Sequence, residues 1–215
     1  MQEAVDIPVT IKCRTGIDDI DSLEHLSHFV GTVARSGTHC FIIHARIAVL
    51  DGLSPKQNRE IPPLNYERVF NIKEQYPDLE IVINGGIRTL DQAKQLLGKV
   101  DGVMIGREAY QNPGMLAQVD QEIFNSNESI ISQEEVLEQF IDYAREEMIS
   151  GTALKHMSRH ILGLFQGQPG AKQFRRYLSE NAHKDTSGIE ILEQAGSFIR
   201  KNSTTTDSIS QEALC

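Results

Sequence analysis

Residues 81–90, Ile81-Val-Ile-Asn-Gly-Gly-Ile-Arg-Thr-Leu90, contain the pattern on which the fold prediction rests. The run begins with three β-branched residues, which favours a strand buried on both faces, as in a parallel sheet. Two glycines follow, and Thr89 then stands three residues before Gln92, which is typical of a capping box at the start of a helix. The stretch therefore predicts a strand, a tight glycine loop and a helix in direct succession.

The same succession recurs through the first half of the chain. Strand-like runs lie at residues 9–12, 40–44, 81–84 and 102–106, and amphipathic helical stretches lie between them. This alternation predicts four parallel β-α units of an α/β fold. Four units are too few to close an eight-stranded barrel. An open, doubly wound sheet is therefore the alternative to half of a barrel.

The chain changes character near residue 125. A polar segment is followed by Ser132 and Glu135, which form a second capping box, and by apolar residues at helical spacing as far as Met148. No comparable strand-like run follows. We predict an α/β domain at residues 1–124, a helical domain at 125–200 and a disordered tail at 201–215.

The composition excludes several classes of protein. Of the 215 residues, 40% are hydrophobic and 24% charged, which is ordinary for a soluble globular protein. No apolar run approaches the roughly 20 residues that span a bilayer, and no secretory signal stands at the N-terminus. Cys13, Cys40 and Cys215 are odd in number and widely spaced, which favours the reducing cytoplasm over a disulfide framework. The net charge of −9 disfavours a uniformly basic nucleic-acid surface but leaves room for a local patch.

Every predicted strand ends in a polar or glycine cluster, where α/β folds place their sites. The clusters are Lys12-Cys-Arg14, His44-Ala-Arg46, Asn84-Gly-Gly86 and Gly106-Arg107. Gly85 and Gly86 allow close backbone approach, and the following helix offers N–H groups to an anion. Gly106 repeats this pattern, and Arg107 adds a guanidinium. The two clusters together predict a phosphate site, and the alternative is a pair of simple turns.

Three side chains near these ends have more than one interpretation. Lys12 lies in an otherwise apolar strand, where it would hold a phosphate or a flavin ring, or reach solvent from the sheet edge. His44 suits cofactor stacking, acid-base chemistry or a core hydrogen bond, and the lack of a second histidine at ligand spacing disfavours a metal. The cations beside Cys13 would lower the pKa of its thiol, although a buried strand cysteine is more often inert packing. Strand alternation, however, points Cys13 away from the face that Lys12 uses.

Two basic features suggest a polyanionic partner. The connection after residue 44 is long, which is typical of functional loops, and it carries Arg46, Lys56 and Arg59. The segment 155–184 has six Lys and Arg residues against one acid, Glu180. This segregation predicts a phosphate-binding surface. The alternative is a solvated helix that balances its acidic neighbour.

These residues together resemble the tRNA-dihydrouridine synthases, in particular their A-type bacterial branch. The resemblance runs from about residue 5 to about residue 200. The matching stretches are Val9-Thr-Ile-Lys-Cys-Arg-Thr-Gly-Ile-Asp-Asp19, Phe41-Ile-Ile-His-Ala-Arg46, Gly52-Leu-Ser-Pro-Lys-Gln-Asn-Arg-Glu-Ile-Pro-Pro-Leu64, Ile83-Asn-Gly-Gly-Ile87 and Gly102-Val-Met-Ile-Gly-Arg-Glu-Ala-Tyr-Gln-Asn-Pro113. The stretch from Gly52 to Leu64 is the most specific of them.

The resemblance implies a TIM (β/α)8 barrel followed by an all-helical domain. It also implies bound FMN, with NADPH as the reductant that turns uridine into dihydrouridine in the D-loop of tRNA. By matching motif, Lys12 and His44 would contact the flavin ring system. The residues that would hold the ribityl-phosphate tail are Asn84, Gly85, Gly86, Gly106 and Arg107. The residues that would touch tRNA are Lys56, Arg59, Lys172 and Arg175.

The chain departs from the family pattern in one respect. The family's first four strands, and the loop with its proton-donating cysteine, have no counterpart here. Cys13 lies in the lysine strand motif, so we assign no catalytic residue, and we assign no metal ligand. We expect the chain alone to be poorly stable, to bind FMN weakly and to be inactive. A separate N-terminal half of the barrel is a candidate partner.

Two other functions compete with this interpretation. One is a half-barrel that binds tRNA or a phosphorylated ligand without redox chemistry. The other is an FMN barrel oxidoreductase that acts on a small molecule. The loop 52–64 and the basic helical segment argue against the second, because a small substrate needs neither.

Overall fold

A computed structural model describes residues 1–184 and 187–199. The chain forms two compact units, which divide between Gly106 and Arg107. This division comes earlier than the expected boundary at residue 124, because the short helices after Arg107 pack within the helical unit: the Tyr110 hydroxyl, for example, hydrogen-bonds His160. The expected tail, residues 201–215, lies outside the described residues.

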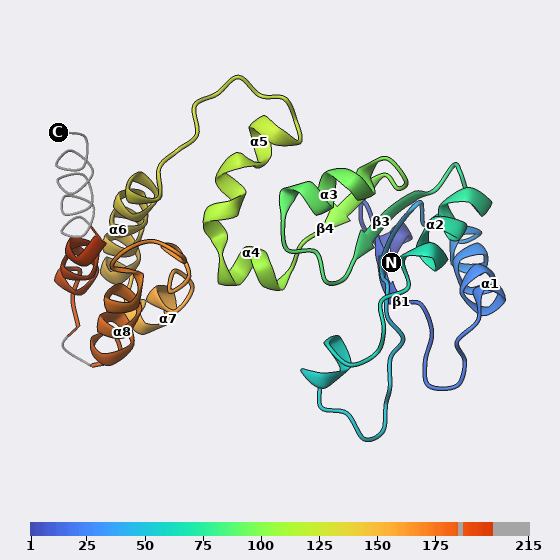
Figure 1. Cartoon of the computed structure of the whole chain (residues 1–215), viewed down its shortest axis with the longest axis horizontal. Helices are drawn as coiled ribbons and strands as arrows, with labels where there is room; N and C mark the ends of the chain where they lie inside the picture. The colour runs from blue at the N-terminus through green and yellow to red at the C-terminus, as the bar shows by residue number, and fades with distance from the viewer. Residues whose placement is uncertain (185–186, 200–215) are drawn as a thin grey trace, which may run out of the picture. The chain divides into compact units, whose positions relative to one another are not determined.

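The first unit is a four-stranded parallel sheet with order β1-β2-β3-β4 (Figure 1). The strands are β1 (Ile11–Arg14), β2 (Cys40–His44), β3 (Glu80–Asn84) and β4 (Gly102–Met104). Three helices connect them: α1 (Leu23–Ala34), α2 (Tyr66–Gln75) and α3 (Leu90–Leu97). Two short 3-10 helices complete the unit, η1 (Gln2–Ala4) and η2 (Gln57–Arg59). The prediction of parallel β-α units in the first half of the chain is confirmed.

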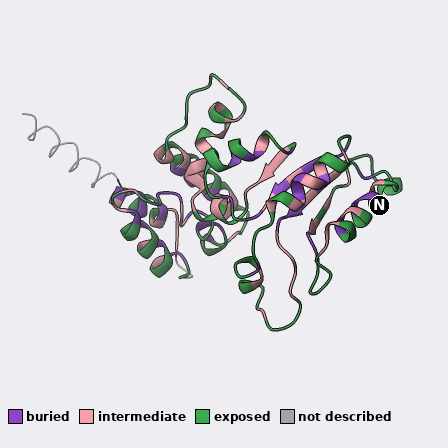
Figure 2. Ribbon diagram, turned by 45° about the vertical axis from the view of Figure 1, so that its right-hand side comes forward, coloured by how far each residue is buried: buried purple, intermediate pink, exposed green. Residues whose placement is uncertain are grey.

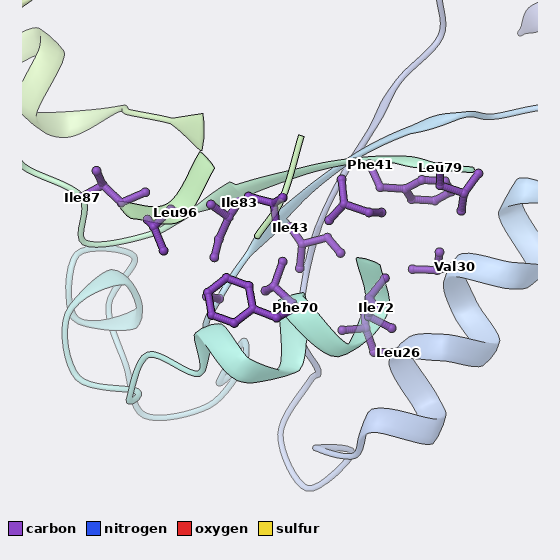
Figure 3. Close-up of a cluster of buried hydrophobic side chains, with 14 of the residues drawn as sticks. Leu26, Val30, Phe41, Ile43, Phe70, Ile72, Leu79, Ile83, Ile87 and Leu96 are labelled. Atoms are coloured by element: carbon purple, nitrogen blue, oxygen red, sulfur yellow. The ribbon is translucent and has the colours of Figure 1, made fainter. Parts of the chain in front are cut away.

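The strand order decides how the sheet is wound. Because each connection moves one strand along in the same direction, right-handed crossovers place all three helices on one face of the sheet. The buried core shows this arrangement: Phe41, Ile43 and Ile83 are fully buried against side chains of α1, α2 and α3 (Figure 3). A doubly wound sheet would carry helices on both faces. The sheet is singly wound, which is consistent with part of a (β/α)8 barrel.

The opposite face of the sheet is only partly buried. Lys12 is exposed on this face, and its neighbours Ile42, Val82 and Gly102 in the same cross-strand row are half-buried. Figure 2 shows buried and half-buried residues along the strands, and exposed residues on the helices and loops. In a closed barrel this face is the interior, into which site residues project.

A side-chain cap begins α3 at Thr89, where the sequence predicts it. Thr89 Oγ1 accepts the N–H of Gln92 at 3.2 Å at the start of α3. The Gln92 side chain accepts from the N–H of Arg88 at 2.8 Å, one residue before the position that a capping box uses. The cap on α3 therefore forms in a variant geometry, and the helix begins directly behind the glycine loop.

The second unit is helical in its described residues. Its elements are α4 (Arg107–Gln111), η3 (Pro113–Gln118), α5 (Val119–Glu122), α6 (Gln133–Ile149), α7 (Leu154–Ser158), α8 (Ala171–Asn181) and a helix at 190–199. The predicted capping box of Ser132 and Glu135 begins α6 and is confirmed. A second core forms around Leu137, Phe165 and Phe174.

One ion pair ties the sheet to its connections and makes a testable prediction. The Asp101 carboxylate accepts the N–H of Ile81 at 2.8 Å and pairs with the Lys73 ammonium at 2.8 Å. Burial raises the pKa of Asp101, but the Ile81 and Lys73 bonds outweigh it and leave this pKa below its usual value. We expect Asp101→Asn to cost about 1 kcal/mol of unfolding free energy at neutral pH.

The pH dependence of this contribution has a definite sign. A lowered carboxyl pKa stabilises the fold above the ordinary aspartate value of about 4, and the gain disappears as pH falls through the folded-state pKa. Denaturant unfolding across this range should show the two proteins converging in acid. Asp91→Asn is the control, because Asp91 is 85% exposed and pairs only with Lys94 within the described residues. Equal losses for the two variants would contradict the assignment.

Candidate functional site

The carboxyl ends of the strands form one row across the sheet. Arg14, His44, Asn84 and Met104 are direct cross-strand partners, so their side chains leave the same face. Lys12 lies two residues before Arg14 on that face. The structure thus brings together three of the predicted site residues, Lys12, His44 and Asn84.

A polar chain links the outer strands of this row. The Lys12 ammonium donates to Asn84 Oδ1 at 3.3 Å, and Asn84 Nδ2 donates to the Met104 carbonyl at 2.8 Å. The second bond fixes the amide orientation, because only its NH2 group can donate. Partial burial of the ammonium, and then the Arg14 guanidinium, lower the pKa of Lys12. The Lys12 ammonium is therefore a hydrogen-bond donor held in place on the face of the sheet that the helices leave uncovered.

The glycine loop after β3 lies against His44. Gly85 has φ +125° and Gly86 has φ +69°, backbone conformations that residues other than glycine rarely adopt. A Cβ on Gly85 would stand 2.8 Å from the His44 ring and 2.9 Å from Leu64. Tyr66, at the start of α2, donates its hydroxyl to the Gly85 carbonyl at 2.5 Å. The loop is therefore held from both sides with its backbone close to the histidine.

The same loop presents donors toward an anion. Among the described residues, the N–H groups of Gly85, Gly86 and Ile87 have no acceptor, although Gly85 and Ile87 are buried. Buried N–H groups without a partner are rare in folded proteins. Successive free N–H groups in such a turn, ahead of a helix N-terminus, make a concave anion site. This donor set fits the phosphate of a flavin mononucleotide.

Cys13 faces the helices instead of this site. It packs against the core of the first unit, and burial outweighs Lys12 and raises the pKa of Cys13 to about 11. The neighbouring cations therefore do not activate this thiol. Among the described residues, no group of three or more His, Cys, Asp or Glu side chains gathers as a metal site would require.

Arg14, at the end of β1, forms hydrogen bonds with the long connection between β2 and α2. Its guanidinium donates to the carbonyls of Ile47 and Asn58 at 2.7 and 2.9 Å. Asn58 in turn accepts the N–H of Val49 at 2.9 Å, which closes the base of the loop. The sequence predicts the importance of this loop, but gives Arg14 no role, because its partners are backbone carbonyls more than 30 residues away.

The loop carries the cations that were expected to contact tRNA. Lys56 and Arg59 are exposed at η2, which Figure 1 shows on the long excursion after β2. Burial, then the charges of Arg59 and Arg46, lower the pKa of the Arg14 guanidinium. The Arg14 guanidinium at the end of β1 is therefore close enough to Arg59 and Arg46 to feel their charges.

The remaining predicted residues lie beyond β4. Gly106 ends the first unit, and Arg107 opens α4 in the second. Lys172 and Arg175 are exposed on α8 at i, i+3 spacing, which places them on one side of that helix. The cations predicted to contact tRNA therefore lie in both units.

Residues 1–200 match the family described as dihydrouridine synthase (Dus). The chain belongs to the dihydrouridine synthase family. Relatives named tRNA-dihydrouridine(20/20a) synthase include those of Shewanella oneidensis, 56% identical over 195 residues, and Yersinia pestis, 55% identical over 196 residues. The relative from Escherichia coli strain K12 is 56% identical over 196 residues.

The match is uneven in its coverage. It takes in 91% of this chain in all three cases, but only 58%, 57% and 57% of the respective dihydrouridine synthases. Among solved structures, a crystal structure of mandelate oxidase covers 91% of this chain at 12% identity. The match takes in 63% of the mandelate oxidase chain with a TM-score of 0.39. This similarity is too low to support a conclusion about fold or function. None of the helices in the described residues is long and apolar enough to cross a membrane.

Proposed function

We propose that this chain supplies the flavin-phosphate and tRNA-binding part of a tRNA-dihydrouridine synthase, which reduces uridine to dihydrouridine in the D-loop of cytoplasmic tRNA. The observation that carries the proposal is the row of Lys12, His44 and Asn84 beside a glycine loop with free N–H groups, in a chain of this family. FMN is the proposed cofactor and NADPH the reductant. FMN, once bound and reduced by NADPH, would supply hydride to the uracil ring.

The residues divide the work of binding among them. Lys12 would place its charge and hydrogen bonds at a flavin carbonyl or ring nitrogen, and His44 would contact the ring system. The N–H groups of the loop at Gly85 and Gly86 would hold the phosphate, with Asn84 orienting Lys12. Gly106 and Arg107 are proposed to contribute to the same tail by the family motif. Lys56 and Arg59 on the long loop, with Lys172 and Arg175 on α8, would contact tRNA.

The general acid is proposed to come from another half of the barrel. Within the described residues, the edge of β1 away from β2 has no strand partner. A cavity of about 480 Å³ opens along this strand, lined by apolar groups that include Leu26 and Phe29 of α1. Another β-α unit suits this place, since an unpaired strand edge seeks a partner. The relatives' extra length is consistent with such a half.

We expect Lys12→Met to weaken FMN binding about ten-fold, because it removes a charge-assisted hydrogen bond from the flavin. The measurement is quenching of flavin fluorescence on titration with the 215-residue chain. Lys94→Met is the control, since Lys94 lies on α3 and pairs with Asp91 at 3.5 Å. Equal affinities for the two variants would contradict the assignment of Lys12.

Riboflavin, which lacks the phosphate, tests the glycine loop in the same titration. We expect riboflavin to bind at least about ten-fold more weakly than FMN. Equal binding of the two flavins would contradict a phosphate site at Gly85 and Gly86.

The activity of the chain is tested by measuring dihydrouridine in unmodified tRNA in the presence of NADPH and FMN. We expect none from the chain alone, and formation once the N-terminal part of the Shewanella oneidensis relative is co-expressed; failure of that pair would count against the proposed function.

A further inference from the structure

Three side chains of the helical unit form a network that the family motifs do not assign. Tyr110, in α4, hydrogen-bonds His160 Nδ1 through its hydroxyl at 3.0 Å, and the two rings meet edge to face with centroids 5.8 Å apart. Arg159 donates from Nε to His160 Nε2 at 3.1 Å. Tyr110 nevertheless remains 56% exposed. An aromatic ring is thus held in place and presented to solvent.

The network fixes which atoms are free to bind. Because Arg159 Nε can only donate, His160 Nε2 must accept, and the neutral imidazole carries its hydrogen on Nδ1. Nδ1 therefore donates to the Tyr110 hydroxyl, whose own hydrogen stays available. Arg159 uses one of its five N–H groups on the histidine, and within the described residues its two terminal amino groups have no partner. The histidine positions a hydroxyl donor and a guanidinium side by side.

Two adjoining cavities meet at Arg159, and we call them the Arg159 cavities. The first, of about 260 Å³, is lined by Tyr110, Arg159 and Arg175 among others. The second, of about 270 Å³, is lined by Arg159, Lys155 and His183. Among the described residues, no carboxylate lines either one. Each is smaller than the roughly 300–1,000 Å³ usual for a whole small-molecule ligand, which favours successive parts of an extended anion.

The cations at these cavities have no acidic partner in the described part of the chain. Lys155 and Arg175 form no ion pair there, whereas Arg176, the next residue after Arg175, donates to the Glu180 carboxylate at 2.8 Å. The two adjacent arginines on α8 therefore differ: Arg176 is neutralised by Glu180, and Arg175 is available to bind an anion. Unpaired guanidinium groups beside an exposed aromatic ring are the combination that binds single-stranded nucleic acid.

We propose that the Arg159 cavities bind two successive nucleotides of an unpaired RNA segment. One backbone phosphate lies between Arg159 and Arg175, and its base stacks on Tyr110. The next phosphate enters the cavity of Lys155 and His183. This site deepens the proposed tRNA-binding function and rests on it. The single-stranded form is required because a paired base would not be free to cover the tyrosine ring.

The test is binding of the 215-residue chain to fluorescently labelled RNA, measured by anisotropy at several salt concentrations. The probes are an unmodified tRNA transcript, a short single-stranded RNA and a duplex of the same length. We expect Arg175→Ala to weaken tRNA and single-strand binding about ten-fold and to lower the slope of log affinity against log salt by about one. Arg176→Ala is the matched control, with the same charge change one residue away, and we expect wild-type binding from it.

The aromatic part has its own comparison. Tyr110→Ala should lose at least about five-fold in affinity for the single strand and little for the duplex, whereas Tyr110→Phe keeps the stacking surface and most of the affinity. Circular dichroism confirms that each variant is folded. If the unaltered chain binds tRNA but the 175 and 176 variants behave alike, the inference is overturned and the proposed function stands. If the unaltered chain binds no RNA, both fall, and binding of an acidic protein instead would also overturn this site.

Discussion

Gly85→Ala is expected to lower the free energy of unfolding by about 3 kcal/mol and to abolish FMN binding. Two costs add at this position. At φ +125° a side chain other than glycine is strained by about 1–3 kcal/mol. The new Cβ would also stand 2.8 Å from His44 and 2.9 Å from Leu64, and overpacking of this kind typically costs about 1–3 kcal/mol.

The loss of flavin has a separate physical reason. Relief of the contact requires either the His44 ring to move or the loop to turn, and both displace groups proposed to hold the flavin. Urea unfolding and flavin titration of the same variant measure the two effects. Gly98→Ala is the control, because Gly98 ends α3 with ordinary helical φ and its Cβ would meet no atom within 4 Å. A Gly85 variant as stable as the Gly98 variant would refute the strained loop.

Phe174→Ala is expected to cost about 4 kcal/mol, the largest effect of any single change considered for the helical unit. The ring is fully buried in the second core, and it meets Phe165 edge to face with centroids 5.0 Å apart. Truncation of a buried phenylalanine removes its transfer free energy and leaves a cavity, together about 3–5 kcal/mol. α8 carries Lys172 and Arg175, so we expect RNA binding to fall with the stability.

Two further variants make this prediction specific. Phe174→Leu keeps most of the buried volume and is expected to cost only about 1–2 kcal/mol. Phe124→Ala removes a ring that is 71% exposed and should stay within about 0.5 kcal/mol of the unaltered chain. Denaturant unfolding followed by circular dichroism ranks the three. If truncation at 174 costs no more than at 124, the second core is not organised around that ring.

Local signals in the sequence predicted the elements well. Periodicity and caps are properties of neighbouring residues, so the strand at Ile81, the cap at Thr89 and the box at Ser132 each follow from a few positions. The alternation that pointed Cys13 away from Lys12 is equally local. The interpretation of Cys13 as an inert, buried strand residue agrees with its thiol pKa, which burial raises to about 11, and that burial depends on helices far along the chain.

The long-range features escaped prediction for a common reason. Arg14 acts on carbonyls at Ile47 and Asn58, and Tyr110 meets His160 fifty residues later. The spacings between these residues match no local sequence pattern that would predict the contacts. The division of the chain between Gly106 and Arg107 likewise has no local signal, whereas the change of composition that the sequence shows comes near residue 125.

The glycine loop illustrates the division between sequence and structure. By itself the sequence determined that a strand, two glycines and a capped helix follow one another, and that the chain resembles the dihydrouridine synthases. Only the tertiary structure decided that the sheet is singly wound, and that Lys12, His44 and Asn84 share one face. Local preferences act over a few residues, whereas winding and register are set by burial of the helices on one side of the sheet.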